Sequence, residues 1–574
     1  MPDKDKDFID LEDENNIDDS MFEDINEPQA EPEKELAEAF APEKPKGFKQ
    51  KFKAFVKDLW QNPKKRWSLI IGSTVFVMLV LMLPTTRYFV LNTVGVRSSA
   101  SVKVLDESTG QPLKNVSVKL SEVEAKTNED GVAKLENLKL GNTQLIIQKR
   151  AFAESNKNVT LGWGSNPLGE QKIKPSGIQY SFDVKDFLSG KPIEKAEAVS
   201  GEYSAFSDEK GRVVLTIDQP GEDTIKITIK AKDYREEPVN QETENKDVQS
   251  VAMAPARKQV FVSKRSGKYD VYQVDVDGKN EQLVLSGTGN EREDMSLVAS
   301  PDNNMAVLVS SRDNTRNKDG FLLSTLTLID LNGDATTTEP ITKSEKVQII
   351  GWSGSQLVYV KIADGTSGNT PDRHRLITYN VETGENKEIA KSNYFNDVLM
   401  IGEDIYYAPS SAFQEGGQGL YKVNAKGENN KTVFNSEVWN VFRTDYDTVM
   451  FSVQADWYEY DLASNKVLAA SGPPSAQITR VYIDGPEKKK SLWVDQRDGK
   501  GALVAYDTDS KEDKVVKMQS GLTYPVLWVS GSTVVYRINT DQETADYAVS
   551  VEGGEPKKIK DVTNTGGIDR WYYY

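Results

Sequence analysis

One short acidic run has the composition of a cation site. Residues 275–281 read DVDGKNE, which places carboxylate and amide side chains at alternating positions, as in the first half of a calcium-binding loop. A complete loop of that kind also needs a bidentate glutamate at its twelfth position and a helix on each side, whereas the flanking residues here have the pattern of β-strands. We therefore predict a hairpin turn, and the same holds for Asp330–Asp334.

Residues that could act as nucleophiles or proton carriers are few. The chain has no cysteine and one histidine, His374, so thiol nucleophiles, disulfides and multi-histidine metal sites are excluded. The run Gly351–Ser355 (GWSGS) has serine where a nucleophile elbow needs its final glycine. Carboxylate pairs such as Glu291 and Glu293 are common, but no spacing selects one for acid–base work. We predict that the chain is not an enzyme, that it holds no cofactor or metal, and that His374 is structural.

Aromatic side chains are the remaining candidates for binding. We expect most of them to pack in the core of the C-terminal domain, and a few to rim a central channel, where they could stack on sugars or peptides. No ligand-binding residue is singled out by sequence alone. The candidates are Tyr406, Tyr407, Trp439, Trp457, Trp493, Tyr572 and Tyr573.

The net charge of −17 is unevenly distributed along the chain. Residues 1–43 carry 17 acidic residues and three lysines, and the mildly acidic bulk after residue 66 argues against a nucleic-acid partner. We predict that residues 1–43 form a disordered cytoplasmic tail, because they have few apolar side chains to offset the entropy cost of ordering. Its apolar cluster Ile17–Ile25 could dock on a cytoplasmic protein; the alternative is a solubilising tail.

A membrane span is predicted over residues 67–86. No charged residue falls between Arg66 and Arg87, and an uncharged run of this length forms about 30 Å of helix, which matches a bilayer core. Trp67 and Tyr88 stand at its two ends, where amphipathic rings favour the headgroup region. A buried core helix is the alternative, but no other stretch of the chain is as long and as apolar.

Residues 44–66 are predicted to form a basic amphipathic helix on the inner leaflet, broken at Asn62-Pro63. Its alternative is a helix packed on a partner protein. The positive charge on this side of the span predicts a single pass in the cell membrane, with the N-terminus inside and the C-terminal bulk outside. The residues expected at the membrane interface are Phe48, Lys51, Phe52, Phe55, Lys64, Lys65, Arg66, Trp67 and Tyr88.

An internal repeat with an offset of 80 residues follows the span. Asp106, Gly110 and Pro112 return as Asp186, Gly190 and Pro192, within segments that read as short strands and glycine turns. The shared pattern D-x-x-[ST]-G-x-P-[LI] with a later E-x-G resembles the carboxypeptidase-regulatory-like (transthyretin-like) β-sandwich repeat of bacterial surface proteins. That resemblance implies two spacer or adhesion domains, which we place at 98–165 and 175–240, with a link near 158–175 between them and a linker at 241–257.

Residues 258–574 contain a second, less regular repeat. Segments such as SPDNNMAVLVSSRD (300–313) and STLTLIDLNGD (324–334) resemble the blades of TolB-type (WD40-like) β-propellers, which implies a β-propeller. Residues 258–288 supply three strands of a further blade, and Ile568–Tyr574 (IDRWYYY) would add its inner strand, for a predicted total of seven. The six complete blades are expected at 294–343, 347–392, 397–435, 437–471, 476–520 and 522–562.

The predicted fold class is therefore mainly β, with a membrane anchor, two small β-sandwich domains and a propeller. The function that we expect is non-catalytic: the propeller is held outside the membrane and engages an extracytoplasmic envelope protein or glycan. The alternative is a scaffold that couples a cytoplasmic partner, bound by the acidic tail, to an extracellular envelope complex. A degenerate hydrolase is a third and weaker hypothesis. Fold alone does not select among them.

Overall fold

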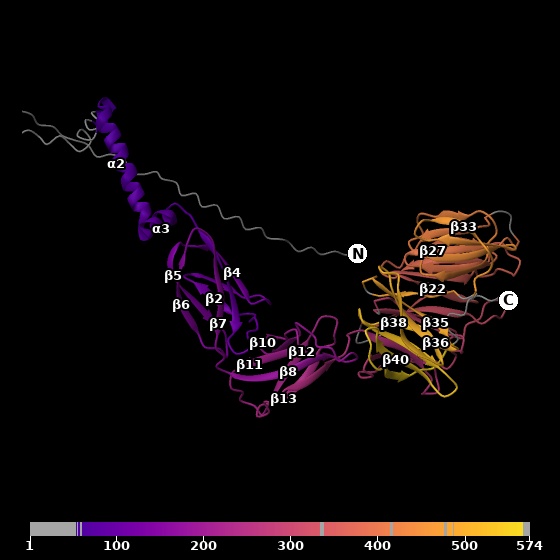
Figure 1. The fold of residues 1–574 in the computed structure, drawn as a ribbon. Helices are drawn as coiled ribbons and strands as arrows, with labels where there is room; N and C mark the ends of the chain where they lie inside the picture. The colour runs from indigo at the N-terminus through magenta and orange to yellow at the C-terminus, as the bar shows by residue number, and fades with distance from the viewer. Residues whose placement is uncertain are drawn as a thin grey trace, which may run out of the picture. The chain divides into compact units, whose positions relative to one another are not determined.

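The computed structural model describes residues 53, 56–57, 60–302, 304–332, 338–413, 417–475, 479–485 and 487–565, mostly as β-strands (Figure 1). The prediction of a mainly β chain is confirmed. Residues 1–87 and 88–574 form two compact units, which are taken separately below. The predicted tail at 1–43 lies outside the described residues, as do Phe48, Lys51, Phe52 and Phe55.

Two helices precede the strands, α2 (Pro63–Met82) and α3 (Pro84–Thr93). Asn62 is extended, with φ −114° and ψ 100°, and Pro63 opens α2, so the chain breaks where Asn62-Pro63 predicts. A single helix over 67–86 is wrong, because Leu83 is extended (φ −80°, ψ 118°) before Pro84, as proline disfavours the helical conformation in the residue before it. Among the described residues, no helix combines the length and the apolar character needed to cross a bilayer.

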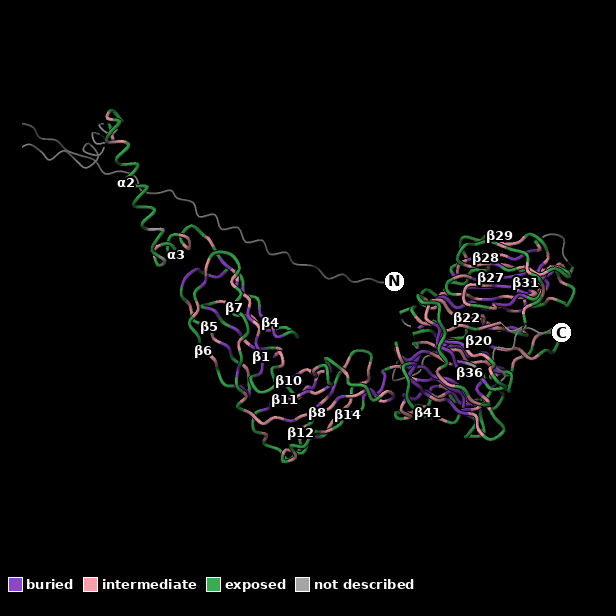
Figure 2. The backbone as a smooth tube through the Cα atoms, viewed as in Figure 1, coloured by how far each residue is buried: buried purple, intermediate pink, exposed green. Residues whose placement is uncertain are grey.

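The first β unit consists of two sheets that enclose one hydrophobic core. Alternate residues of each strand, among them Val102, Val118 and Leu145, point into that core, and Figure 2 shows the resulting mixture of buried and exposed positions along the chain. One sheet has the order β4 (Val132–Leu138), β1 (Ser98–Asp106), β7 (Gly164–Ile173). The other has the order β3 (Val123–Lys126), β2 (Ser117–Leu120), β5 (Gly141–Gln148), β6 (Ser155–Leu161).

The second β unit has the same strand order as the first. Its core gathers Phe182, Ile229 and Met253 among other apolar side chains. One sheet has the order β11 (Arg212–Ile217), β8 (Ile178–Asp186), β14 (Gln249–Met253). The other has the order β10 (Tyr203–Phe206), β9 (Glu197–Ser200), β12 (Thr224–Lys230), β13 (Glu237–Glu242).

The last strand of each unit differs from the sequence prediction. β7 falls in the segment that we assigned to the link at 158–175, and β14 falls in the predicted linker at 241–257. Both strands pair in parallel with the first strand of their unit, β7 with β1 and β14 with β8. A parallel partner far away in sequence leaves no hairpin signal, and only one side of β14 is apolar and buried, through Val251 and Met253.

The repeated glycine of the two units is required by close packing. Gly131 has φ +73°, and a Cβ on it would stand 2.6 Å from the carbonyl oxygen of Val104. Its counterpart Gly211 has φ +74°, and a Cβ there would stand 2.4 Å from the carbonyl oxygen of Val184. A side chain at either position would meet backbone while strained in the left-handed region, so the repeat keeps glycine.

Residues 258–565 fold into consecutive antiparallel sheets, seven of them among the described residues. The first has three strands, β15 (Lys258–Ser263), β16 (Asp270–Asp275) and β17 (Gln282–Leu285). The second to fourth are β18 (Ser296–Ala299), β19 (Met305–Ser310), β20 (Ser324–Asp330), β21 (Thr338–Ser344); β22 (Val347–Ser353), β23 (Gln356–Ile362), β24 (His374–Asn380), β25 (Asn386–Ser392); and β26 (Phe395–Ile401), β27 (Asp404–Pro409), β28 (Leu420–Asn424), β29 (Lys431–Phe434). The fifth to seventh are β30 (Trp439–Asp445), β31 (Thr448–Val453), β32 (Asp456–Asp461), β33 (Lys466–Ala470); β34 (Ile483–Asp484), β35 (Lys490–Arg497), β36 (Lys500–Asp507), β37 (Asp513–Gln519); and β38 (Leu522–Trp528), β39 (Thr533–Asn539), β40 (Thr544–Ser550), β41 (Lys557–Asp561).

The sheets close into a ring. Hydrophobic clusters join neighbouring sheets around it, and the cluster that contains Phe261 of β15 and Ala548 of β40 joins the last sheet to the first. Gln259 Nε2 donates to Asp546 Oδ2 across the same junction (2.7 Å). Radial sheets that pack face to face around a closed circle form a β-propeller. The predicted inner strand at Ile568–Tyr574 lies outside the described residues.

The ring has two unlike ends, because connections between antiparallel strands alternate from one end to the other. The connections at one end include 276–281, 300–304, 529–532 and 551–556, and we call it the docked end, since it contacts the second β unit. The opposite end, the long-loop end, carries the longest connections of the ring, 286–295, 311–323, 363–373, 410–419 and 471–482. The long connections thus all gather at one end.

Candidate functional site

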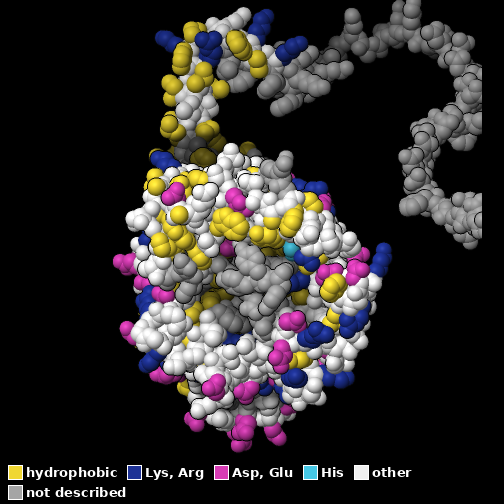
Figure 3. All heavy atoms as spheres, turned by 90° about the vertical axis from the view of Figure 1, so that its right-hand side faces the viewer, with side chains coloured by type: hydrophobic (Ala, Val, Ile, Leu, Met, Phe, Trp, Pro, Cys, Tyr) yellow, Lys and Arg dark blue, Asp and Glu magenta, His cyan; other side chains and the backbone are white. Residues whose placement is uncertain are grey.

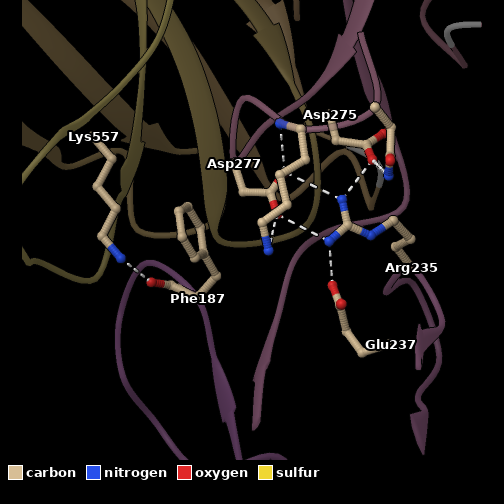
Figure 4. Close-up of polar contacts among 8 residues, drawn as sticks. Phe187, Arg235, Glu237, Asp275, Asp277 and Lys557 are labelled. Carbon is tan, nitrogen blue, oxygen red and sulfur yellow. Dashed lines mark hydrogen bonds and ion pairs between the residues drawn. The ribbon is translucent and has the colours of Figure 1, made fainter. Parts of the chain in front are cut away.

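The acidic run 275–281 is a hairpin turn at the docked end. Gly278 N donates to the carbonyl oxygen of Asp275 (2.8 Å), and Asp275 N donates to that of Lys279 (3.0 Å). Its carboxylates receive an arginine from the second β unit, because Arg235 Nη1 donates to Asp275 Oδ2 (2.5 Å) and Nη2 donates to Asp277 Oδ2 (2.9 Å). Arg235 also pairs with Glu237, beside it on β13 (Figure 4). The run that resembles a cation site therefore forms one side of the interface between the ring and the second β unit, which we call the joint.

Burial and ion pairing shift the pKa values of these charged groups in opposite directions. Burial favours the neutral form of Asp277, but hydrogen bonds from Arg235 and from the backbone of Lys279 outweigh it, so the pKa of Asp277 is lowered. Burial also acts against the charge of Arg235, yet its bonds to Asp277, Asp275 and Glu237 raise its pKa overall. Pairing thus favours the charged forms of Asp277 and Arg235, and the four groups form a charge cluster largely shielded from water.

Further contacts surround the charge cluster. Lys557 Nζ donates to the carbonyl oxygen of Phe187 and lies 3.7 Å from the centre of its ring (Figure 4). Leu188, in the connection after β8, and Ala254, directly after β14, belong to the hydrophobic cluster of the closing sheets. Arg257 donates to the carbonyl oxygens of Pro301 (3.0 Å) and Trp528 (3.2 Å). Polar and apolar contacts together tie the second β unit to the docked end.

The long-loop end presents aromatic side chains to solvent. Phe321 is 58% exposed in loop 311–323, and Phe413 is 57% exposed in loop 410–419. Phe413 also has φ +60°, a conformation that bulky side chains rarely adopt. The face of the ring drawn in Figure 3 likewise gathers hydrophobic side chains in a band along one side. Exposed aromatic side chains of this kind suit contacts with proteins or sugar rings.

Hydrogen bonds and ion pairs link the long loops to one another. Asn317 of loop 311–323 donates to Glu345 Oε1 (2.7 Å), and Glu345 pairs with Arg373 of loop 363–373 (3.6 Å). Asn393 Nδ2 donates to the carbonyl oxygens of Gly368 (2.7 Å) and Thr370 (2.8 Å) in the same loop. Contacts within the chain therefore hold these loops in place without a ligand.

His374 and Glu291 contact the backbone of the loops at this end. His374 is buried, its Nδ1 contacts the carbonyl oxygen of Asn393, and burial lowers its pKa. Glu291 accepts from Thr288 N (2.8 Å) and Gly289 N (2.8 Å), and these bonds lower its pKa despite burial. Their surroundings suit a structural role.

The remaining sequence candidates are scattered. Lys64 and Trp67 are exposed on α2, and the guanidinium of Arg66 lies 6.0 Å from the Trp60 ring, whereas the side chain of Lys65 is outside the description. Tyr88 lies against Gly141 of the first β unit, where an added Cβ would be 3.5 Å from its ring. Tyr406, Tyr407 and Trp493 are buried between blades, Trp439 and Trp457 are half-buried, and Tyr572 and Tyr573 lie outside the described residues.

Two hollows stand out at the surface of the described residues. One, of about 720 Å³, is lined by residues of both β units, including Lys149, Arg150 and Tyr203. Burial lowers the pKa of Lys149 to about 8, and its Nζ donates to the carbonyl oxygen of Lys114 (2.7 Å). The other, of about 400 Å³, lies on the ring and is lined by Tyr536, Tyr547 and Pro556 among others. Within the described part of the chain, no cluster of three acidic or histidine side chains could hold a metal ion.

Sequence reasoning missed Arg235, Phe321 and Phe413. Arg235 lies in a polar run, YREEP, with no sign of its distant partners. Phe413 did leave a signal, since it is a single large apolar residue in a run of polar residues and glycines, SSAFQEGG. Phe321 is followed by Leu322 and Leu323, so its sequence does not set it apart from the strand that follows.

No protein-family model matches the chain, and no curated protein matches its sequence. Three solved structures illustrate the similarities in fold. An oligogalacturonate lyase in complex with manganese is 12% identical, with 51% of this chain and 85% of that chain covered and a TM-score of 0.33. TolB from Acinetobacter baumannii is 14% identical, with 52% and 81% covered and a TM-score of 0.27. The β-propeller domain of the Trilobed protease from Pyrococcus furiosus is 12% identical, with 60% and 96% covered and a TM-score of 0.33. At these values the similarities say nothing of activity or ligand, and the propeller architecture rests on the strand pairing and core packing described above.

Proposed function

We propose that this chain is a non-catalytic binding protein of the cell surface. A single span anchors it in the membrane with its N-terminus inside, the two β units serve as spacers, and the propeller engages an envelope protein or glycan through its long-loop end. The observation that carries the proposal is the contrast between the ends of the ring: the second β unit occupies one end, and the exposed aromatic side chains and long loops lie at the other.

The sequence and the exposure of α2 support the anchor. Residues 67–86 carry no charge, and basic residues stand directly before them, as at the inner end of a membrane anchor. Ile71, Phe76 and Val77, which lie on different sides of α2, are all exposed. A helix that is apolar all round needs a surrounding that is also apolar, and a bilayer supplies one.

The two β units support the role of spacers. They repeat one strand order, and they resemble the carboxypeptidase-regulatory-like β-sandwich repeats of bacterial surface proteins. Ion pairs such as Lys114 with Glu197 (3.1 Å) connect the first unit to the second, and Arg235 connects the second unit to the ring. Such connections favour a spacer that fixes the position of the ring relative to the β units, rather than a flexible linker.

Retention experiments with the full-length protein in detergent test this function. We expect saturable retention on either purified cell-wall polymer or solubilised envelope proteins. The double variant Phe321→Ala/Phe413→Ala should reduce that retention by at least tenfold, because exposed aromatic anchors contribute much of the binding energy at such surfaces. Leu283→Ala is the matched control, since Leu283 is also an exposed apolar residue but lies in the outer strand β17. Equal retention of the double variant and the wild type would refute a role for the long-loop end.

A further inference from the structure

The blades share one buried position, here called the fourth position. It is the fourth residue of one strand in each blade, namely β15, β19, β23, β27, β31, β35 and β39. The strand registers align these residues, because in each blade the first residue of that strand pairs with the last residue of the next strand. Every residue at the fourth position is large and buried. In chain order they are Phe261, Leu308, Tyr359, Tyr407, Phe451, Trp493 and Tyr536.

Two tyrosines at the fourth position have partners for their hydroxyl groups. Tyr359 donates to Asn386 Oδ1 (3.0 Å), and Tyr407 accepts from Asn430 Nδ2 (2.8 Å). Asn386 opens the outer strand β25, and Asn430 stands directly before the outer strand β29. In these two blades an asparagine at the start of the outer strand therefore supplies the hydrogen-bond partner of the buried hydroxyl.

Tyr536 has no such partner. Its side chain is fully buried, and its hydroxyl makes no hydrogen bond to any residue that the structure describes. Phe261 and Phe451 show that the fourth position does not need a hydroxyl for the blade to fold. Trp493 also has an unpaired polar atom, Nε1, but Arg480 covers its ring at 4.2 Å. A buried hydroxyl without a partner is unfavourable, so its presence in this blade calls for a reason.

The blade of Tyr536 has a hollow where the other two blades have asparagine. Pro556 stands directly before the outer strand β41, and proline has no side-chain group that could reach a hydroxyl. The 400 Å³ hollow is lined by Pro556 and Tyr536 together with residues of the neighbouring blade such as Gln519. Its volume lies within the range of small-molecule sites.

The lining has the chemistry of a sugar site. Tyr536 and Tyr547 stack with ring centres 5.8 Å apart, so the buried Tyr536 supports the half-buried ring of Tyr547 at the wall of the hollow. Gln519 and Gln542 can each donate and accept. Glu543 is a fixed acceptor, because Tyr547 (2.9 Å) and Lys558 (2.8 Å) both donate to it. With Glu543 and Glu555 as carboxylates and Lys517 as the one cation among the lining residues, an acidic ligand is disfavoured.

We propose that this hollow binds the end of a neutral oligosaccharide, with the hydroxyl of Tyr536 bonded to the ligand. The apolar face of a sugar ring packs on Tyr547, and its hydroxyls bond to the glutamines and to Glu543. The site uses other blades than the exposed phenylalanines of the long-loop end, so it holds whether or not Phe321 and Phe413 bind anything.

Calorimetric titration of the full-length protein with cellotetraose and with chitotetraose tests the proposal, in a detergent without a sugar headgroup. We expect at least one of the two to bind. Tyr536→Phe should weaken that binding about tenfold, as loss of one hydrogen bond to the ligand does. The same variant should raise the melting temperature by about 2 °C, because it removes a buried hydroxyl without a partner.

Tyr359→Phe is the matched control at the equivalent position. It removes a hydroxyl that has a partner, so it should lower the melting temperature and leave binding unchanged. Gln542→Trp, at an exposed edge of the hollow, should block binding without a change in stability. The proposal is overturned if neither tetrasaccharide binds, if Tyr536→Phe binds as the wild type does, or if Tyr536→Phe lowers the melting temperature as Tyr359→Phe does.

Discussion

The two ends of the propeller are built from the same strands but have opposite surfaces. At the docked end the connections are short, their carboxylates are paired with Arg235, and Leu188 and Ala254 are covered. At the long-loop end the connections are long, and Phe321 and Phe413 are exposed. The strands determine the ring, and the connections determine what each end can do.

This difference separates two kinds of evidence for function. Charges and apolar residues at the docked end have partners within the chain, so they account for stability. The phenylalanines of the long-loop end make no comparable contribution to a core, and the conformation of Phe413 is strained. Features that fold does not explain are the better guides to binding.

The largest effect is expected at the docked end, from Arg235→Ala. This change leaves Asp275 and Asp277 buried without the arginine that pairs with both, which costs about 3 kcal/mol in such sites. Calorimetry should show a lower unfolding temperature, and protease should cleave the segment between the second β unit and the ring faster. Lys279→Ala is the control, since Lys279 pairs with Asp277 at 3.5 Å but is largely exposed, and should cost at most about 1 kcal/mol. Equal effects of the two variants would mean that the charge cluster does not hold the joint.

Acid should weaken the docked end, where Asp277 is paired with Arg235. The pKa of Asp277 is lowered from its ordinary 3.8 in the folded chain, so its contribution is complete above the ordinary pKa and is lost as pH falls through the lower, folded pKa. Thermal unfolding followed from pH 6 to pH 2.5 should therefore show a loss of stability below about pH 4. Because part of that loss arises from Arg235, the Arg235→Ala variant should have a flatter profile. A parallel profile in the variant would contradict the assignment.

Much of the fold could be predicted from the sequence, because strand and turn signals are local. The 80-residue repeat reflects matched strands, since β1 and β8 begin at Ser98 and Ile178. Strands whose partners are distant and parallel, β7 and β14, were misread as links. The helix break at Leu83 was missed because hydropathy gave Pro84 too little weight.

The sites were harder to predict than the fold. The acidic run 275–281 was recognised as a turn, but its partner Arg235 lies 40 residues away and carries no motif. The unpaired hydroxyl of Tyr536 becomes visible only when the blades are superposed by register, since its sequence VVYRI resembles LVYVK around Tyr359. Partners in space, rather than residue types, distinguish these positions.

The smallest effect, and the most direct test of the contrast between the ends, is expected from Phe413→Gly. Glycine adopts φ +60° without strain, so this variant should gain about 0.5–1 kcal/mol of stability while it loses an exposed aromatic side chain. Phe413→Ala removes the same ring but keeps a Cβ, and should not gain that stability. If chemical denaturation shows the glycine variant to be more stable and retention on the envelope ligand falls in both, then Phe413 is kept for binding at some cost to folding. If the glycine variant is less stable than the wild type, the ring of Phe413 contributes to folding, and the long-loop end loses its strongest sign of a binding role.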